Sequence, residues 1–324
     1  MGTNVTRGLC TVLAVLMMHG WTSAQPGRKS AGGQPEKQPE EQRVPRVLSE
    51  EEWIRELDRI QALGDNDIAE QEMCQFLVSF AEYGASSGYV KLLQRIMEVP
   101  EFESFNELFP QYAYQFSCAR LRFLSHFRDY AGVREFVLKA MESQLPHIQP
   151  EAAATLLAWG EWDLAAPVIC KYEAYHLFQI HRDERAIPLL EEAVRSGSWQ
   201  ERILAAAALF YTYGDSTKYP QVALDIILNA PVNSTDLSTN RAKYMALAQV
   251  IRFNLTEALP GLVRLAQDTA RGIAPTAVGY LVDLGAMGHP EATQALIDIK
   301  EHHSNATTRE IAKNGLFKLE NEEK

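Results

Sequence analysis

The sequence has little positive charge for its size. Lys and Arg number 31 against 42 Asp and Glu, which gives the 324 residues a formal net charge of −11. No cluster of Lys or Arg offsets this balance. Nucleic-acid backbones and anionic membrane surfaces are bound through clustered cations. The composition therefore excludes nucleic acid as the expected partner and disfavours an anionic membrane surface.

Cysteine is scarce, with four residues in the chain. Cys10 lies in an apolar N-terminal stretch, and the others are Cys74, Cys118 and Cys170. Their spacing forms neither a Cys-x-x-Cys pair nor a zinc-ligand pattern. Removal of an export signal that ends at Ala24, argued below, would leave the last three. Because three is an odd number, at least one thiol is then free or pairs with another chain. We interpret them as buried free thiols, with a disulfide between Cys74 and Cys118 as the alternative in an oxidising compartment.

Sequence signatures of catalysis are also missing. No Gly-x-Gly-x-x-Gly, Walker loop, His-Glu-x-x-His or Gly-x-Ser-x-Gly occurs. His176 and His181 are five residues apart, so they do not share a helix face, and His302 and His303 are adjacent. We interpret all four as surface residues and Asp183 as part of a helix start. The sequence therefore predicts no catalytic residue, no cofactor and no metal site.

The N-terminal 24 residues follow the order of an export signal. Arg7 precedes an apolar stretch over residues 8–18, and three small residues end at Ala24. The stretch is shorter than the roughly 20 residues needed to span a bilayer. We therefore expect a signal peptide over residues 1–24 and an exported protein, periplasmic or secreted. An uncleaved membrane anchor is the alternative.

Residues 25–47 are polar, contain several Pro and Gly, and have almost no apolar side chain. Such a segment buries too little surface to offset the entropy lost on ordering. We expect it to be a disordered tether. No later segment reaches membrane-spanning length, so no integral membrane segment is expected after signal cleavage.

Helical periodicity begins at Leu48 and continues almost throughout. Apolar residues recur three and four apart, without a convincing alternating run, which predicts an all-α chain. Ser49 followed by three glutamates predicts a capped helix start. The apolar face expected for this helix consists of Trp53, Ile54, Leu57, Ile60 and Leu63.

The C-terminal half contains a repeated pattern. A helix with an early proline recurs, and a proline in the first turn costs little because its missing N–H would have no partner there. These prolines are Pro188, Pro220, Pro260 and Pro290. Steps of 35, 37 and 34 residues separate the equivalent positions Ile187, Val222, Leu259 and Thr293. Alanine-rich second helices are expected between them, at 201–213, 240–253, 275–284 and 308–319.

These segments resemble HEAT repeats of the bacterial, PBS-lyase-like type. In that family the first helix begins Ala-x-Pro-x-Leu, and an alanine-rich second helix ends Leu-Gly-Asp. Ala186–Leu190 fits the first helix, and Glu201–Phe210 with Gly214 and Asp215 fits the second. The resemblance covers about residues 185–319. It departs from the pattern where Gly-Asp is missing from most turns and where the loop 230–239 is long.

The resemblance implies a right-handed α-solenoid of antiparallel helix pairs. TPR repeats are the alternative because their period is close to 34, but their tryptophan-containing signature is missing here. We expect HEAT-like repeats over residues 185–324. Residues 48–184 are expected to form divergent helical repeats or a helical cap. Aromatic residues are dense from Phe102 to Tyr130, which we interpret as core, with a peptide-binding groove as the alternative.

A solenoid with no visible active site favours a scaffold for protein interactions, since stacked helix pairs present long binding surfaces. The partner is expected to be a protein or peptide. In the resembling family the second helices line the concave side, and three tyrosines there are the predicted partner-binding residues: Tyr211, Tyr244 and Tyr280. Tyr213 is expected inside. The alternatives are an enzyme, a lyase or hydrolase, with a dispersed site, or a structural subunit of an envelope assembly.

N-glycosylation sequons occur at Asn233, Asn254 and Asn305. In a eukaryotic secretory pathway they could carry glycans, whereas in a bacterial periplasm they would mean little. The sequence leaves this choice open.

Overall fold

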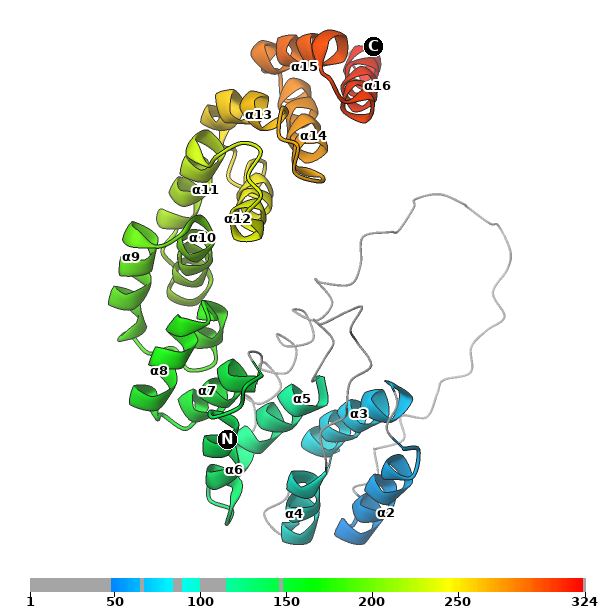
Figure 1. Ribbon diagram of the computed structural model, residues 1–324, viewed down its shortest axis with the longest axis vertical. Helices are drawn as coiled ribbons and strands as arrows, with labels where there is room; N and C mark the ends of the chain where they lie inside the picture. The colour runs from blue at the N-terminus through cyan, green and yellow to red at the C-terminus, as the bar shows by residue number, and fades with distance from the viewer. Residues whose placement is uncertain (1–47, 65–66, 84–88, 100–114, 146–147, 323–324) are drawn as a thin grey trace, which may run out of the picture. The chain divides into compact units, whose positions relative to one another are not determined.

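The computed structural model describes residues 48–64, 67–83, 89–99, 115–145 and 148–322 (Figure 1). The expected signal peptide, the expected tether and the aromatic residues between 102 and 114 lie outside these ranges. The chain divides into two compact units, with the division between Phe123 and Leu124. The boundary expected at 184/185 marks a change in sequence regularity and falls inside the second unit.

The described residues form fifteen α-helices, short 3₁₀ turns and one π turn, without a strand, which confirms the predicted all-α fold class. The helices of the first unit are α2 (Glu50–Gln61), α3 (Asp67–Tyr83), α4 (Val90–Glu98) and α5 (Gln115–Leu124), whose last residue begins the second unit. Among these described helices, none combines the length and apolar character that crossing a bilayer requires.

The start of α2 follows the predicted capping pattern. The Ser49 hydroxyl accepts a hydrogen bond from the Glu52 backbone N–H at 3.3 Å, and the Glu52 carboxylate accepts one from the Ser49 N–H at 2.8 Å. This capping box satisfies two N–H groups that the helix itself leaves unpaired. Trp53, Leu57 and Ile60 are buried as expected, but Leu63 is exposed because it lies beyond the end of the helix.

Aromatic packing fills the core of the first unit. The Trp53 ring meets the Phe76 ring edge to face, with centroids 5.4 Å apart, and Phe80 lies 5.3 Å from Phe123. Phe116 and Phe123 are buried, as is Phe127 in the second unit. The core interpretation is therefore confirmed for these members of the aromatic-rich segment.

The second unit continues with eleven α-helices among its described residues. They are α6 (Val133–Ala140), α7 (Ile148–Ala158), α8 (Trp162–Lys171), α9 (Ala186–Ser196), α10 (Trp199–Ala208), α11 (Lys218–Asn229), α12 (Leu237–Leu247), α13 (Leu259–Leu265), α14 (Ile273–Ala286), α15 (Pro290–His302) and α16 (Ala306–Glu322). Short turns η2 (Ser125–Phe127), η3 (Tyr175–Gln179) and η5 (Thr256–Ala258) are 3₁₀, whereas η4 (Leu209–Tyr213) is a π turn.

From α9 onward these helices pack as successive pairs in two layers (Figure 1). The first helices α11, α13 and α15 contact one another in turn, and so do the second helices α10, α12, α14 and α16. Pro260 and Pro290 lie in the first turns of α13 and α15, as predicted. One prediction fails: α12 ends at Leu247 rather than Phe253, and turns occupy residues 248–254.

Small residues set the spacing between the repeats. A Cβ on Gly261 of α13 would lie 2.5 Å from the Ile227 carbonyl oxygen of α11, and one on Gly315 of α16 would collide with Val282 of α14. Both glycines are therefore needed for close helix approach. The contacts belong to one hydrophobic core that runs through the repeats from Ile203 to Leu316.

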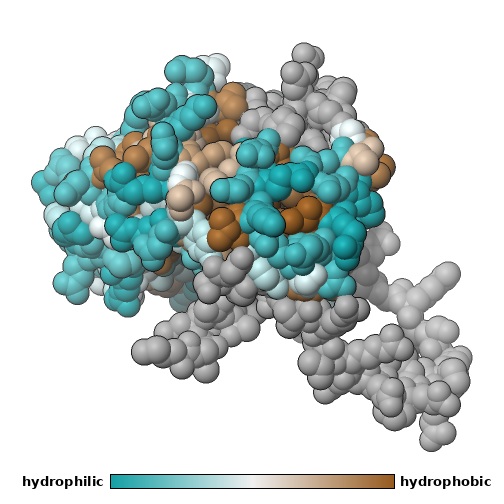
Figure 2. Space-filling model, turned by 90° about the horizontal axis from the view of Figure 1, so that it is seen from below, coloured by the Kyte–Doolittle hydropathy of each residue, from teal (hydrophilic) through white to brown (hydrophobic). Residues whose placement is uncertain are grey.

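On the face shown in Figure 2, hydrophilic side chains predominate and hydrophobic ones form separate groups among them. Scattered apolar side chains of this kind are normal on protein surfaces.

Cys74, Cys118 and Cys170 are half-buried, and the Cys74–Cys118 disulfide is not formed. Burial raises the pKa of Cys74 to about 12. A thiol with such a pKa is protonated at neutral pH and is a poor nucleophile.

Candidate functional site

The three tyrosines predicted to bind a partner differ in their exposure to solvent. Tyr211 is 57% exposed and Tyr244 is 40% exposed, whereas Tyr280 is half-buried and packs against the hydrophobic core. Tyr213, expected inside, is also half-buried, and its hydroxyl donates to the Asp183 carbonyl oxygen at 2.7 Å. The most exposed of the four rings is therefore Tyr211.

Tyr211 owes its position to the π turn η4. The α-helix α10 gives way to a wider turn at Leu209, and the N–H of Gly214 bonds back toward the carbonyl oxygens of Leu209 and Phe210. Gly214 then ends the turn with φ of +79°, a left-handed conformation that glycine adopts without strain. π turns of this kind occur at the C-termini of helices. The sequence pattern did not reveal this one.

Four rings pack together beside the turn. Tyr211 meets Phe210 edge to face at 5.0 Å between centroids, and it meets Tyr219 of α11 at 5.9 Å. Phe253, after α12, lies 5.4 Å from Phe210 and 5.8 Å from Tyr219. Tyr219 is buried, and this burial raises the pKa of its hydroxyl to about 12. The aromatic cluster thus has a buried base, Tyr219, and an exposed edge, Tyr211.

A cation lies on this cluster. The Arg252 guanidinium carbon is 5.1 Å from the Tyr211 centroid, and 5.4 Å from each of the Phe210 and Phe253 centroids. The guanidinium also donates a hydrogen bond to the Tyr211 hydroxyl oxygen. Ring faces attract cations at such distances. We call Phe210, Tyr211, Tyr219, Arg252 and Phe253 the Tyr211–Arg252 cluster.

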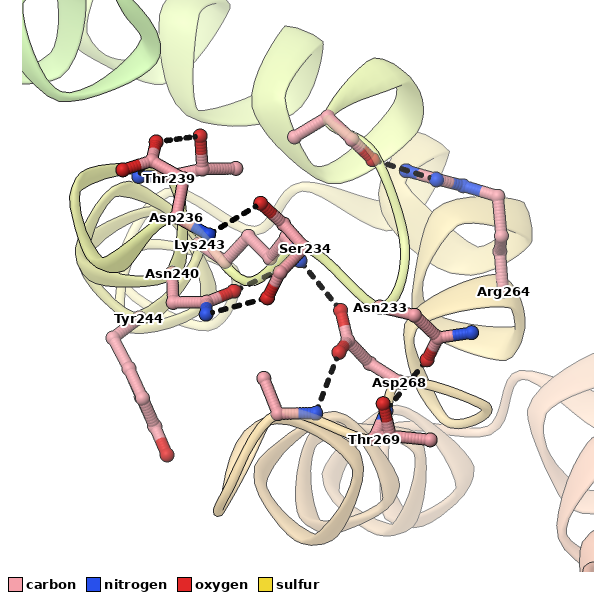
Figure 3. Close-up of polar contacts among 12 residues, drawn as sticks. Asn233, Ser234, Asp236, Thr239, Asn240, Lys243, Tyr244, Arg264, Asp268 and Thr269 are labelled. Atoms are coloured by element: carbon pink, nitrogen blue, oxygen red, sulfur yellow. Dashed lines mark hydrogen bonds and ion pairs between the residues drawn. The ribbon is translucent and has the colours of Figure 1, made fainter.

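Tyr244 lies beside a second, polar network on α12 (Figure 3). Its hydroxyl donates to the carbonyl oxygen of Arg271, just before α14. Lys243, which precedes Tyr244 on α12, is fully buried and forms an ion pair with Asp268 at 2.6 Å. Its ammonium group also donates a hydrogen bond to the Asn240 side-chain oxygen at 3.1 Å. In Figure 3 the Tyr244 side chain points away from this pair.

The same network fixes the loop between α13 and α14. Asp268 accepts a hydrogen bond from the Ala270 N–H at 2.9 Å, and Asn233 accepts one from the Thr269 N–H at 2.7 Å (Figure 3). Because most of these groups are paired with each other, we assign the network to stability rather than to binding.

The histidine prediction is wrong for His303. This residue is 5% exposed and lies between repeats. Its Nδ1 accepts a hydrogen bond from the Asn305 N–H at 3.0 Å, so Nε2 carries the proton and donates to the Ala266 carbonyl oxygen at 2.6 Å. Its burial is explained by the Ala266 carbonyl and the Asn305 N–H, two backbone groups at helix ends that it pairs. Adjacent His302 is exposed, as expected.

Metal ligands do not gather within the ranges that the structure describes: no three His, Cys, Asp or Glu side chains are placed to hold an ion. A surface groove does lie between α13 and α15, with Glu291, Asp298 and His302 along it. These side chains do not form a metal-binding group with one another.

Comparison of the chain with family models, with curated proteins and with solved structures finds no match. Sequence reasoning identified Tyr211 but missed Arg252, which is 41 residues away in the chain. Nothing in the spacing of the sequence indicates that these two side chains meet.

Proposed function

We propose that this chain is an exported helical-repeat scaffold, of the HEAT type, that binds a protein or peptide partner. The observation that carries the proposal is the Tyr211–Arg252 cluster: a large exposed ring on a π turn, beside an exposed arginine. Tyr and Arg are enriched among residues that dominate binding energy at interfaces. Tyr244, exposed on α12, is a second contact residue in this proposal, and half-buried Tyr280 is a lesser one.

The test compares two exposed aromatic side chains of the second helices. Tyr211→Ala removes the proposed anchor, and Phe317→Ala removes a ring that is 68% exposed on α16 and lies outside the cluster. The tagged full chain and both variants are crosslinked and purified from the native compartment. We expect one partner to be captured by the wild type and by Phe317→Ala, and lost with Tyr211→Ala.

A partner retained equally by all three chains would contradict the role of Tyr211. A wild-type chain that retains nothing above an unrelated tagged protein would contradict the scaffold itself. Export is tested on the same material by N-terminal sequencing. We expect the native protein to begin after Ala24, and an intact Met1 on a cytoplasmic chain would contradict export.

A further inference from the structure

Arg252 has more hydrogen-bond donors than the described residues accept from. A guanidinium carries five N–H donors, and Arg252 donates to one hydroxyl, that of Tyr211. Among the described residues it has no carboxylate partner. Other arginines in this acidic chain do: Arg202 pairs with Asp225 at 2.5 Å, and Arg185 pairs with Asp183 at 2.6 Å. Within the part of the chain that the structure describes, no carboxylate therefore offsets the charge of this cation.

The rings hold this guanidinium in place. Contacts with Phe210, Tyr211 and Phe253 restrict its orientation, and its N–H groups lie at the edge of a planar group. Such an edge matches the two oxygens of a carboxylate in a paired geometry. Because the side chain is already ordered, less entropy is lost when that ligand binds.

Apolar surface accompanies the cation. Tyr211 is 57% exposed, and Ile251, beside Arg252 in the chain, is 37% exposed. A small carboxylate would leave this surface uncovered, whereas a peptide segment with an apolar residue next to an acidic one would cover it. Charge complementarity and the exposed apolar area therefore favour an acidic peptide segment over a small carboxylate.

We infer that the Tyr211–Arg252 cluster binds an acidic segment of the partner protein, with a carboxylate on Arg252 and an apolar side chain against the exposed ring of Tyr211. This inference rests on the proposed scaffold function and names the partner chemistry. The net charge of −11 opposes an acidic ligand at long range. At physiological salt that repulsion is screened beyond about 8 Å, while the direct contact is not.

The experiment uses the full chain and three probes. The first is a peptide with one tryptophan between two glutamates, the second is its glutamine counterpart, and the third is free glutarate. Binding is followed through the Nε–Hε resonance of Arg252 and, for the two peptides, through the anisotropy of an attached fluorescein. Arg252→Gln is the test variant. Arg195→Gln is the matched control, since Arg195 is 71% exposed and pairs with Glu192 at 2.9 Å on α9.

We expect the glutamate peptide to shift the Arg252 resonance, and to bind about tenfold more tightly than the glutamine peptide, the size typical of a charged hydrogen bond. Arg252→Gln should lose this preference, and Arg195→Gln should keep it. Equal binding of the two peptides, or no shift at Arg252, would overturn the inference. Glutarate binding as tightly as the peptide would overturn the choice of a peptide segment.

The experiments distinguish failure of the scaffold proposal from failure of the acidic-segment inference. If Tyr211→Ala abolishes partner capture while Arg252→Gln leaves both capture and peptide preference unchanged, the scaffold stands and the acidic-segment inference is wrong. If the wild type captures no partner, the scaffold is wrong whatever the peptides show.

Discussion

Lys243 and Asp268 form an ion pair at 2.6 Å in which neither side chain is reached by solvent. Burial of two charges carries a large desolvation cost, which their attraction offsets only when the remaining donors and acceptors are also satisfied. Here Asn240 accepts from Lys243 and the Ala270 N–H donates to Asp268. The pair therefore joins α12 to the loop before α14 at a position where loss of either charge leaves the other buried and unpaired.

Lys243→Met should destabilise the chain by about 3–5 kcal/mol, because it leaves the Asp268 carboxylate buried without its cation. Urea unfolding followed by circular dichroism measures the change. Lys313→Met is the control: Lys313 pairs with Glu310 on the surface, and such pairs contribute about 0–1 kcal/mol. Adding Asp268→Asn to Lys243→Met should recover part of the loss. Equal effects of Lys243→Met and Lys313→Met would show that the buried pair is not structurally important.

Gly272→Ala should cost more stability than Gly288→Ala. Both glycines have positive φ, +83° and +88°, so alanine at either position is strained by about 1–2 kcal/mol. A Cβ on Gly272 would also collide with the Tyr244 hydroxyl, whereas Gly288 has no atom within 4 Å of that position. The extra loss in melting temperature of Gly272→Ala relative to Gly288→Ala therefore measures the effect of the collision with Tyr244. Combining Gly272→Ala with Tyr244→Phe should reduce it, and no reduction would contradict the assigned contact.

The contribution of Asp215 to the free energy of unfolding should decrease as the pH is lowered. Hydrogen bonds from Lys218 and Thr217 hold the pKa of this carboxyl well below its usual range. A pKa lowered by folding adds stability above the unfolded pKa of about 3.9, and this stability is lost as pH falls toward the folded value. Asp215→Asn should therefore lower the melting temperature at pH 7, with a gap to wild type that narrows below about pH 4. A gap that stays constant across this range would contradict the assignment.

Tyr211→Ala and Tyr219→Ala should differ sharply in stability although the two rings touch. Tyr219 is 4% exposed, and truncation of a buried aromatic costs about 3–5 kcal/mol. Tyr211 is mostly exposed, so we expect a loss under about 1 kcal/mol. Thermal unfolding of the two variants checks this. A large loss for Tyr211→Ala would assign its ring to packing and would weaken the case for a binding residue.

The helices were predictable because their signals are local. First-turn prolines and alanine-rich second helices mark α9 to α16, and Ser49 with Glu52 marks the start of α2. The end of α12 was missed, since apolar residues continue to Phe253 while the backbone turns after Leu247. Periodicity records which side chains are apolar, and a turn packed against the core is as apolar as a helix.

The candidate site was only half predictable. Tyr211 could be singled out because it is a large ring on a second helix of the resembling pattern. Arg252 could not, because its meeting with Tyr211 depends on how one repeat stacks on the next. The same limit explains His303, whose burial follows from two backbone groups that become unpaired only when the helices end where they do.

The π turn at Leu209–Tyr213 has a consequence for the register of the whole segment. A π turn accommodates one residue more than an α-helix needs, and each α-helical residue advances by about 100° around the axis. The side chains of the turn therefore no longer follow the phase of the helical wheel set by α10. A chain shortened by Thr212 would extend the phase of α10 to Gly214 and would rotate the side chains of the segment about the helix axis. The outward direction of Tyr211 is thus set by the length of the segment as much as by the choice of residue.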